Sequence, residues 1–229
     1  MNVSHRFVVI AAIFVTCLIT ANIIAVKPIS LGLRLLGQPV SVPAAIVIFP
    51  LSYIFGDILT EVYGYRLARR VIWLGFFCNL IAVIAIWLGR LLPPASVWGG
   101  QEAYESILGY TPQILSASFL AYLVGEFSNS FVLAKMKILT KGHWLWTRTI
   151  GSTLVGQGLD AAVFITLAYA GRFGFSFIAI TILTHWLLKT GYETVATPFT
   201  YAVVSFLKKK EAIDTFDYET NFNPFLVSD

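Results

Sequence analysis

Charged side chains occur within the apolar segments of this 229-residue chain. One base and five acids lie inside these segments or at their ends: Lys189, Asp57, Glu61, Glu126, Asp160 and Glu193. A charge at the centre of a bilayer costs at least about 2.5–3.5 kcal/mol on insertion scales, and such groups mark substrate or ion pathways. Carboxylates can accept hydrogen bonds from a polar solute, pair with a cation or carry a proton. We therefore expect these six residues to serve a function.

Spacing along the chain groups these residues into helix faces. Residues four apart lie on one face, so Asp57 and Glu61 share a face, which Tyr53 extends by another turn. Three further polar stripes follow the same rule: Tyr122, Glu126 and Asn129; Thr153, Gly156, Gln157 and Asp160; and His185, Lys189 and Glu193. Polar faces of membrane helices turn toward the bundle interior or a wet cavity. The stripes therefore predict a polar pocket at membrane depth.

Some of these residues also have a structural interpretation. Lys189 is four residues from Glu193, so we expect the two to form an ion pair that serves either coupling or the stability of the helix. Glu61 is expected either to extend its side chain toward the membrane surface from a position near a helix end, or to take part in an ion pair or in coupling. Asn22 and Asn79 fit hydrogen bonds between helices.

The composition indicates which elements must position these groups. Hydrophobic residues make up 57% of the chain, charged residues 12%, and the mean hydropathy is +0.77. A soluble domain carries about a quarter charged residues, so a soluble domain of this size is excluded. A membrane-spanning helix needs roughly 20 apolar residues. Six apolar segments of that kind are present: residues 7–26, 42–62, 71–91, 112–134, 147–170 and 175–207. We predict an all-α integral membrane protein with six transmembrane helices.

Lysine and arginine residues are distributed unevenly between the two ends of these segments. If the N-terminus is cytoplasmic, the cytoplasmic side holds Arg6, Arg66, Arg69, Arg70, Lys135, Lys137, Lys141, Arg148, Lys208, Lys209 and Lys210. The outer side holds Lys27, Arg34, Arg90 and Arg172. Because cytoplasmic loops are enriched in basic residues, we expect both termini to face the cytoplasm.

The last apolar segment and the tail carry two further predictions. Residues 175–207 contain Gly191 and Pro198, which favour a single kinked helix, with a broken helix as the alternative. Residues 211–229 are acidic and polar, and we expect a loosely ordered cytoplasmic tail beyond a transporter domain of residues 1–210. The loop of about residues 92–111 is expected to be a plain outer connection, with a cap over a cavity as the alternative.

The chain lacks the motifs of catalysis and of nucleotide binding. It has no G-x-S-x-G, H-E-x-x-H, P-loop or G-x-G-x-x-G sequence, and its three histidines fall in different regions. Cys17 and Cys78 lie in apolar runs, where cysteine is an ordinary small filler. We therefore expect no catalytic residues, no cofactor, no metal site and no nucleic-acid partner. Small residues at Ala117, Ala121 and Gly125 can contact either a neighbouring helix or a second subunit, so a homodimer stays open.

Four stretches resemble the signatures of the queuosine precursor transporter family, also called the vitamin uptake transporter family. They are FPLSYIFGDILTEVYGYRLARR (49–70), GEFSNSFVLAKMK (125–137), RTIGSTLVGQGLDAAVF (148–164) and KTGYETVATPFTYAVV (189–204). The resemblance covers residues 7–210 and extends to the enterobacterial inner-membrane branch. It implies uptake of 7-cyano-7-deazaguanine and 7-aminomethyl-7-deazaguanine for making queuosine in transfer RNA. It also implies the six-helix architecture of the substrate-binding subunits of energy-coupling-factor transporters. The alternative is such a subunit for a vitamin-like solute, dependent on a separate ATPase.

The polar stripes suit that substrate class. A guanine-like base offers N–H donors to a carboxylate, polar edges to Asn or Gln, and a ring face for aromatic stacking. The predicted substrate-binding residues are Glu126, Asp160, Asp57, Asn129, Gln157 and Glu193, with Tyr53 or Tyr122 as the stacking wall. Glu126 is our first choice for the base edge and Asp160 our second. Proton-coupled uptake and facilitated diffusion both fit this interior.

Overall fold

The structure is a computed structural model that describes residues 4–35, 38–109, 112–169, 171 and 174–226. Its elements in chain order are α1 (His5–Ile24), β1 (Pro28–Leu35), β2 (Gln38–Pro43), the 3-10 helix η1 (Ala44–Val47), α2 (Phe49–Tyr63), α3 (Tyr65–Leu91), α4 (Gln101–Leu108), α5 (Pro112–Leu139), α6 (Leu145–Tyr169) and α7 (Phe175–Glu211).

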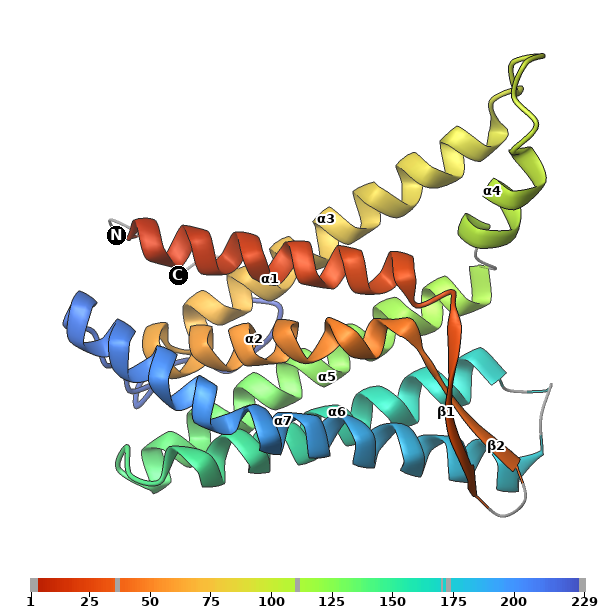
Figure 1. The fold of residues 1–229 in the computed structure, drawn as a ribbon. Helices are drawn as coiled ribbons and strands as arrows, with labels where there is room; N and C mark the ends of the chain where they lie inside the picture. Colours follow the sequence, from red (N-terminus) through yellow and green to blue (C-terminus); the bar gives the residue numbers. More distant parts are fainter. Residues whose placement is uncertain (1–3, 36–37, 110–111, 170, 172–173, 227–229) are drawn as a thin grey trace.

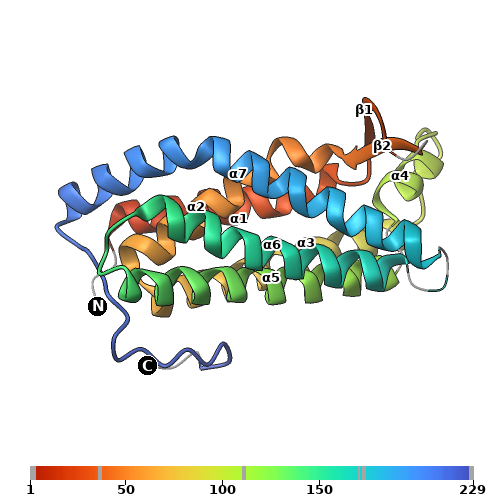
Figure 2. The same ribbon diagram turned by 90° about the horizontal axis from the view of Figure 1, so that it is seen from below.

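Six helices, namely α1, α2, α3, α5, α6 and α7, run along one long axis (Figures 1 and 2). One end of this bundle holds the N-terminus, the turns after α2 and α5, and the end of α7 (Figure 1). We call it the basic end, because the eleven basic residues predicted to be cytoplasmic lie in or beside these segments. The β1–β2 hairpin and α4 lie at the other end, which we call the hairpin end (Figure 1).

Helix α2 occupies the centre of the bundle. It contacts α1, α3, α5 and α7, and twelve of its 15 residues are buried. Its apolar side chains, such as Ile54 and Ile58, join Phe14 of α1 and Val71 of α3 in the main hydrophobic core. Because α2 is enclosed by other helices, its polar side chains face protein on every side. This position explains how a short helix carries two acids.

Four helices in the described part of the chain are long and apolar enough to cross a membrane: His5–Ile24, Tyr65–Leu91, Ile114–Leu139 and Leu145–Tyr169. They correspond to four of the six predicted segments, and the structure confirms a helical membrane protein. The other two segments form α2 and α7. The former is shorter than a usual span, and the latter carries Lys189 and Glu193 in its middle.

Helix α7 is continuous over 37 residues and includes both Gly191 and Pro198. The single helix that the sequence favoured is therefore confirmed over the broken one. Proline at position 198 removes one backbone N–H donor. Side chains near it hydrogen bond back to the helix, since Thr194 Oγ1 donates to the Thr190 carbonyl at 2.8 Å and Thr197 Oγ1 to the Glu193 carbonyl at 3.0 Å. Such bonds help a helix to tolerate an internal proline.

The connections at the hairpin end differ from the prediction. Strand β1 pairs antiparallel with β2, with Ile29 opposite Val42, so the second apolar segment begins as a strand and becomes the helix α2 only at Phe49. Proline lacks a backbone N–H and favours extended backbone in the residue before it. Pro39 and Pro43 therefore favour extended backbone before η1. The outer loop also contains a helix, α4, that the sequence did not indicate.

Helices α5 and α6 approach closely because each presents glycine to the other. A Cβ atom on Gly125 would lie 2.8 Å from Asp160 Cβ, and one on Gly156 would lie 2.7 Å from Asn129 Cβ. The small residues of α5 were predicted to contact either a neighbouring helix or a second subunit. At Gly125 the contact is with the neighbouring helix α6. This contact places two predicted site residues at the same interface.

The C-terminal tail, residues 212–226, packs against the bundle instead of extending loosely. Asp217 is 3% exposed, and its carboxylate accepts hydrogen bonds from the Tyr65 backbone N–H at 3.0 and 3.2 Å. Arg69 Nη1 donates to the carbonyl oxygens of Asn221 and Asn223, at 3.0 and 2.7 Å. The expectation of a loose tail is therefore wrong, because basic and aromatic residues at the start of α3 bind the tail backbone.

Candidate functional site

A cavity of about 910 Å³ lies within the hairpin end of the bundle. Apolar residues of the hairpin, η1 and α4, such as Val42, Ile46 and Ile107, border it on the outer side. Polar and ionisable side chains from α1, α2, α3, α5, α6 and α7 line its inner part: Asn22, Tyr53, Asn79, Tyr122, Gln157, Asp160, His185, Lys189 and Glu193. The structure thus brings six predicted site residues, namely Tyr53, Tyr122, Gln157, Asp160, Lys189 and Glu193, to one cavity.

Lys189 pairs with an acid on another helix, and not with Glu193. Its Nζ lies 2.5 Å from Asp160 Oδ2, and the side chains are 19% and 9% exposed. The predicted Lys189–Glu193 pair is therefore wrong. On one helix, a lysine that precedes a glutamate by four residues is in the less favourable order, while the long lysine stem reaches across to α6. Glu193 is 2% exposed, and its Oε1 has no hydrogen-bond partner among the described residues.

Three predicted residues lie outside the cavity lining, fully enclosed by the helices. Asn129 Nδ2 donates to Asp57 Oδ1 at 2.6 Å, which joins α5 to α2. Glu126 stands one turn before Asn129 on α5 and is 2% exposed. Gly56 leaves room for this acid, since a Cβ there would lie 3.2 Å from Glu126 Oε2. These residues form a second polar layer next to the cavity.

Several buried acceptors in these two layers have no hydrogen-bond partner among the described residues. They are Asp57 Oδ2, Glu126 Oε2, Asn129 Oδ1, Gln157 Oε1 and Glu193 Oε1. An unpaired buried polar atom costs free energy unless a ligand or water binds it. The arrangement can accept hydrogen bonds from several N–H groups of one polar solute. In the described ranges, no group of three His, Cys, Asp or Glu side chains is placed to hold a metal ion.

Aromatic rings form part of the cavity wall. The Phe49 and Tyr53 rings lie 5.4 Å apart at 30°, and Lys189 Nζ lies 4.6 Å from the Phe49 ring centroid. The Tyr122 hydroxyl donates to the Ile72 carbonyl at 2.9 Å, so this ring is held in place by α3. Both predicted stacking residues therefore border the cavity. Phe49 was not among the predicted residues, although it stands one turn before Tyr53 on the same face.

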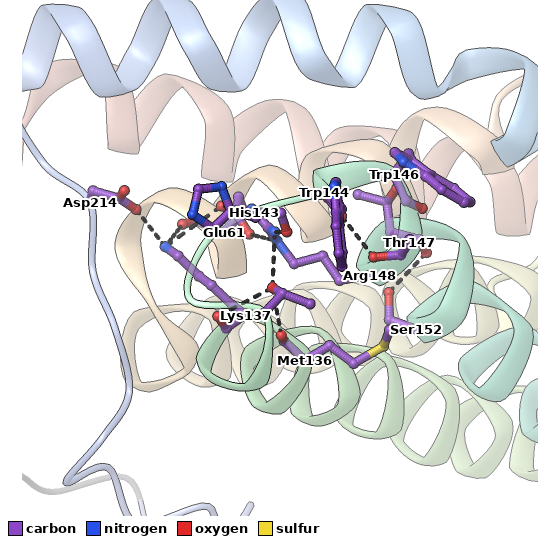
Figure 3. A network of polar contacts seen from close by, with 12 residues as sticks. Glu61, Met136, Lys137, His143, Trp144, Trp146, Thr147, Arg148, Ser152 and Asp214 are labelled. Atoms are coloured by element: carbon purple, nitrogen blue, oxygen red, sulfur yellow. Dashed lines mark hydrogen bonds and ion pairs between the residues drawn. The ribbon is translucent and has the colours of Figure 1, made fainter.

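Glu61 lies at the basic end in a buried ion cluster (Figure 3). Arg148 Nε and Nη2 donate to its two carboxylate oxygens at 2.7 and 2.8 Å. Lys208 Nζ lies 2.6 Å from Glu61 Oε1, and Lys137 Nζ lies 3.6 Å from the same oxygen. The expectation that Glu61 extends to the membrane surface is wrong, since the residue is 0% exposed. From the sequence, Arg148 was predicted only as one of the basic residues on the cytoplasmic side. Its position at the start of an apolar segment was the signal that could have indicated a buried partner for an acid.

The sequence of this chain matches a family of transport proteins over most of its length. The family described as "Putative vitamin uptake transporter" matches residues 43–203. This chain belongs to that family. The family is one of transporters and not of enzymes, which agrees with the prediction made from the sequence. The match includes α6 and most of α7, which carry the cavity acids Asp160 and Glu193, and α2 and α5, which carry Asp57 and Glu126 of the enclosed layer.

Three curated relatives of this chain are named as queuosine precursor transporters. A "Probable queuosine precursor transporter" of Bacillus subtilis (strain 168) is 30% identical over 157 residues, 68% of each chain. The "Queuosine precursor transporter" of Escherichia coli (strain K12) is 27% identical over 121 residues, and so is a probable one of Haemophilus influenzae. These two matches cover 53% of this chain and 52% and 49% of the relatives. The chain is 27% identical to the Escherichia coli relative and 30% identical to the Bacillus subtilis one. These identities support the family and do not favour its enterobacterial branch. No solved structure matches the chain.

Proposed function

We propose that this chain imports queuosine precursors, the 7-cyano and 7-aminomethyl forms of 7-deazaguanine, and that the cavity is their binding site. The observation that carries the proposal is the set of unpaired buried acceptors beside an aromatic wall. Base N–H groups are the donors that such acceptors require, and a planar base can stack on an aromatic ring. The names of the relatives support the same substrate class.

Each layer of the site has a role in this proposal. Gln157 and Glu193 at the cavity wall bind the polar edge of the base, and Tyr53 stacks on its ring. Glu126, in the layer behind, accepts from the base edge when the substrate moves inward. Asp160 remains paired with Lys189, and this pair holds α6 and α7 together around the substrate. The aminomethyl form carries a cation, which the remaining acid Asp57 stabilises.

The proposed topology uses all six long-axis helices as spans. In this topology the short helix α2 crosses the membrane together with η1, enclosed by the neighbouring helices. Helix α7 crosses the membrane with Lys189 and Glu193 facing the cavity. The basic end then faces the cytoplasm of a bacterial inner membrane, with both termini on that side. Six spans of this kind would give the chain the architecture that the family resemblance implies, that of the energy-coupling-factor binding subunits. In this proposal residues 1–210 form the transporter domain and the residues after it form a cytoplasmic tail. The proposed topology is compatible with a homodimer.

Uptake by the purified chain in liposomes tests the function. We expect labelled 7-cyano-7-deazaguanine to accumulate without any ATPase subunit. Glu126→Gln should weaken binding about 10- to 100-fold, because a hydrogen bond to a charged group contributes about 1.5–3 kcal/mol. The matched control is Glu102→Gln, an exposed acid on α4, which should leave uptake unchanged.

Two results would contradict the proposal. Uptake that appears only with an added ATPase module would identify a binding subunit. Wild-type affinity in Glu126→Gln, together with wild-type affinity in Gln157→Ala, would remove the assigned site. Dissipating the proton gradient in the same liposomes separates proton-coupled uptake, which it abolishes, from facilitated diffusion, which it leaves intact.

A further inference from the structure

The cavity stops partway along the bundle. Its lining ends at Tyr53 on α2, at Tyr122 on α5 and at Glu193 on α7, and it begins at Thr153 on α6. None of its lining residues belongs to the basic end. A solute that passes from one end of the bundle to the other must therefore cross the remaining half, into which this cavity does not extend.

Buried polar side chains continue through that remaining half. The Asp57–Asn129 pair is followed by Thr60, whose Oγ1 donates to Ser130 Oγ at 3.1 Å. Thr200 of α7 is 0% exposed, and its Oγ1 has no partner among the described residues. A helix core that served packing alone would be apolar here, since unpaired buried hydroxyls cost free energy. On α2, α5 and α7 these residues lie between the cavity lining and the basic end, and we call them the polar column.

The ion cluster around Glu61 lies at the basic end, beyond the polar column (Figure 3). It joins α2 through Glu61, α5 through Lys137, α6 through Arg148 and α7 through Lys208. The side chains of Glu61, Lys137 and Arg148 are at most 1% exposed. All four helices that border the column are therefore tied together at one point.

The tail is bonded directly to this cluster. Asp214 Oδ1 lies 2.6 Å from Lys137 Nζ and 2.9 Å from Lys208 Nζ. Lys137 Nζ also donates to the Thr215 carbonyl at 2.6 Å, and the Thr215 N–H donates to the Val62 carbonyl at 3.3 Å. The tail thus crosses from α7 to the end of α2 over the closed cluster.

A second set of contacts fixes the far part of the tail. Asp217 accepts from the Tyr65 N–H and caps α3, beside Gly64, whose φ of +84° makes the turn between α2 and α3. The Phe222 ring lies 5.2 Å from that of Phe131 and 4.1 Å from Lys135 Nζ. The tail is therefore held on α3 and α5 as well as on the ion cluster.

We infer that the polar column is the inner half of the transport path, that the Glu61 cluster is its cytoplasmic gate, and that residues 212–226 latch this gate shut. The inference rests on the proposed function for the direction of transport. The latch releases in each cycle, the cluster separates, and the column opens between α2, α5, α6 and α7. The present structure is the form in which the gate is closed.

Accessibility of the column tests the gate without any substrate. Thr200→Cys, in a background with Cys17→Ala and Cys78→Ala, is labelled with a water-soluble thiol reagent added at the basic end. Asp217→Ala should raise the labelling rate about 5- to 30-fold, the population change that follows from loss of a helix cap. The control Glu219→Ala changes an exposed acid of the same tail and should have no effect. Equal rates in all three proteins would overturn the gate.

A reversible staple tests whether the latch must open. Phe131→Cys and Phe222→Cys in the same background are joined by a short, reducible thiol crosslinker. We expect stapled protein in liposomes to keep its thermal shift with 7-cyano-7-deazaguanine, to lose uptake, and to regain it on reduction. Unchanged uptake in the stapled protein would overturn the latch. If unstapled protein shows neither shift nor uptake, the proposed function fails, while the labelling result still decides the gate.

Discussion

Lys189 shows how one partly buried cation selects between two acids. Asp160 lies across the helix interface and bonds to Lys189, whereas Glu193 on the same helix keeps a carboxylate oxygen without a partner among the described residues. The sequence predicted that all three residues lie together, because their spacing put them on inward faces. It could not predict the pairing, which depends on how far α6 and α7 are rotated about their axes. Rotation is set by packing between helices and not by spacing within one helix.

The two acids should therefore differ in their effect on stability. Asp160→Asn leaves the partly buried Lys189 without its partner and should lower the free energy of unfolding by about 1–3 kcal/mol. Glu193→Gln should stay within about 1 kcal/mol of the wild type, because no ion pair is lost. Thermal unfolding in detergent measures both. Adding Lys189→Met to Asp160→Asn should restore most of the loss, and equal destabilisation by the two single variants would contradict the assigned pair.

At the scale of elements, the close contact of α5 and α6 positions the site. Glycine at 125 and 156 lets the two backbones approach, and the same contact sets Asn129 and Asp160 on the neighbouring layers of the site. The sequence indicated this packing through its small residues. It gave no indication of the hairpin, because residues 28–43 contain no turn signal strong enough to distinguish two strands from an apolar loop.

A side chain at Gly156 should disturb both packing and binding. Gly156→Val places atoms within 2.7 Å of Asn129 Cβ and 3.0 Å of the Gly125 carbonyl. Overpacking of this kind costs about 1–3 kcal/mol, and the displaced Asn129 should release Asp57 and reduce uptake. Gly191→Ala is the control on α7, where nothing lies within 4 Å, and it should raise stability by up to about 1 kcal/mol. Similar stability in both variants, by thermal unfolding, would show that the glycine contact is dispensable.

At the scale of the whole molecule, electrostatics connects the tail to the bundle. Burial alone would raise the pKa of the Asp214 carboxyl, but hydrogen bonds from Lys137 and Lys208 and their charges hold the pKa below its ordinary value of 3.8. An acid with a lowered folded pKa stabilises the docked tail above its unfolded pKa. The contribution is lost as the pH falls below 3.8 and through the lower folded value. The sequence identified the acidic tail but not its binding surface, because the bound groups are mainly backbone carbonyls.

Acid should therefore release the tail. A fluorophore on Tyr218→Cys, an exposed position, should keep its anisotropy down to about pH 4 and lose it as the pH falls further below 3.8. Asp214→Asn should show lower anisotropy already at neutral pH and a smaller change on acidification. A pH profile that is identical with and without the Asp214 carboxylate would contradict this assignment.

The charged centre of α2 also bears on how the protein is made. This helix has 15 residues and carries two acids, and Glu61 meets Arg148 only 87 residues later in the chain and Lys208 only 147 residues later. During synthesis, α2 therefore leaves the ribosome long before the cations that neutralise Glu61. In the proposed topology, where α2 is a span, Glu61 enters the membrane before its partners are made, so we expect truncation of α6 and α7 to impair the insertion of α2.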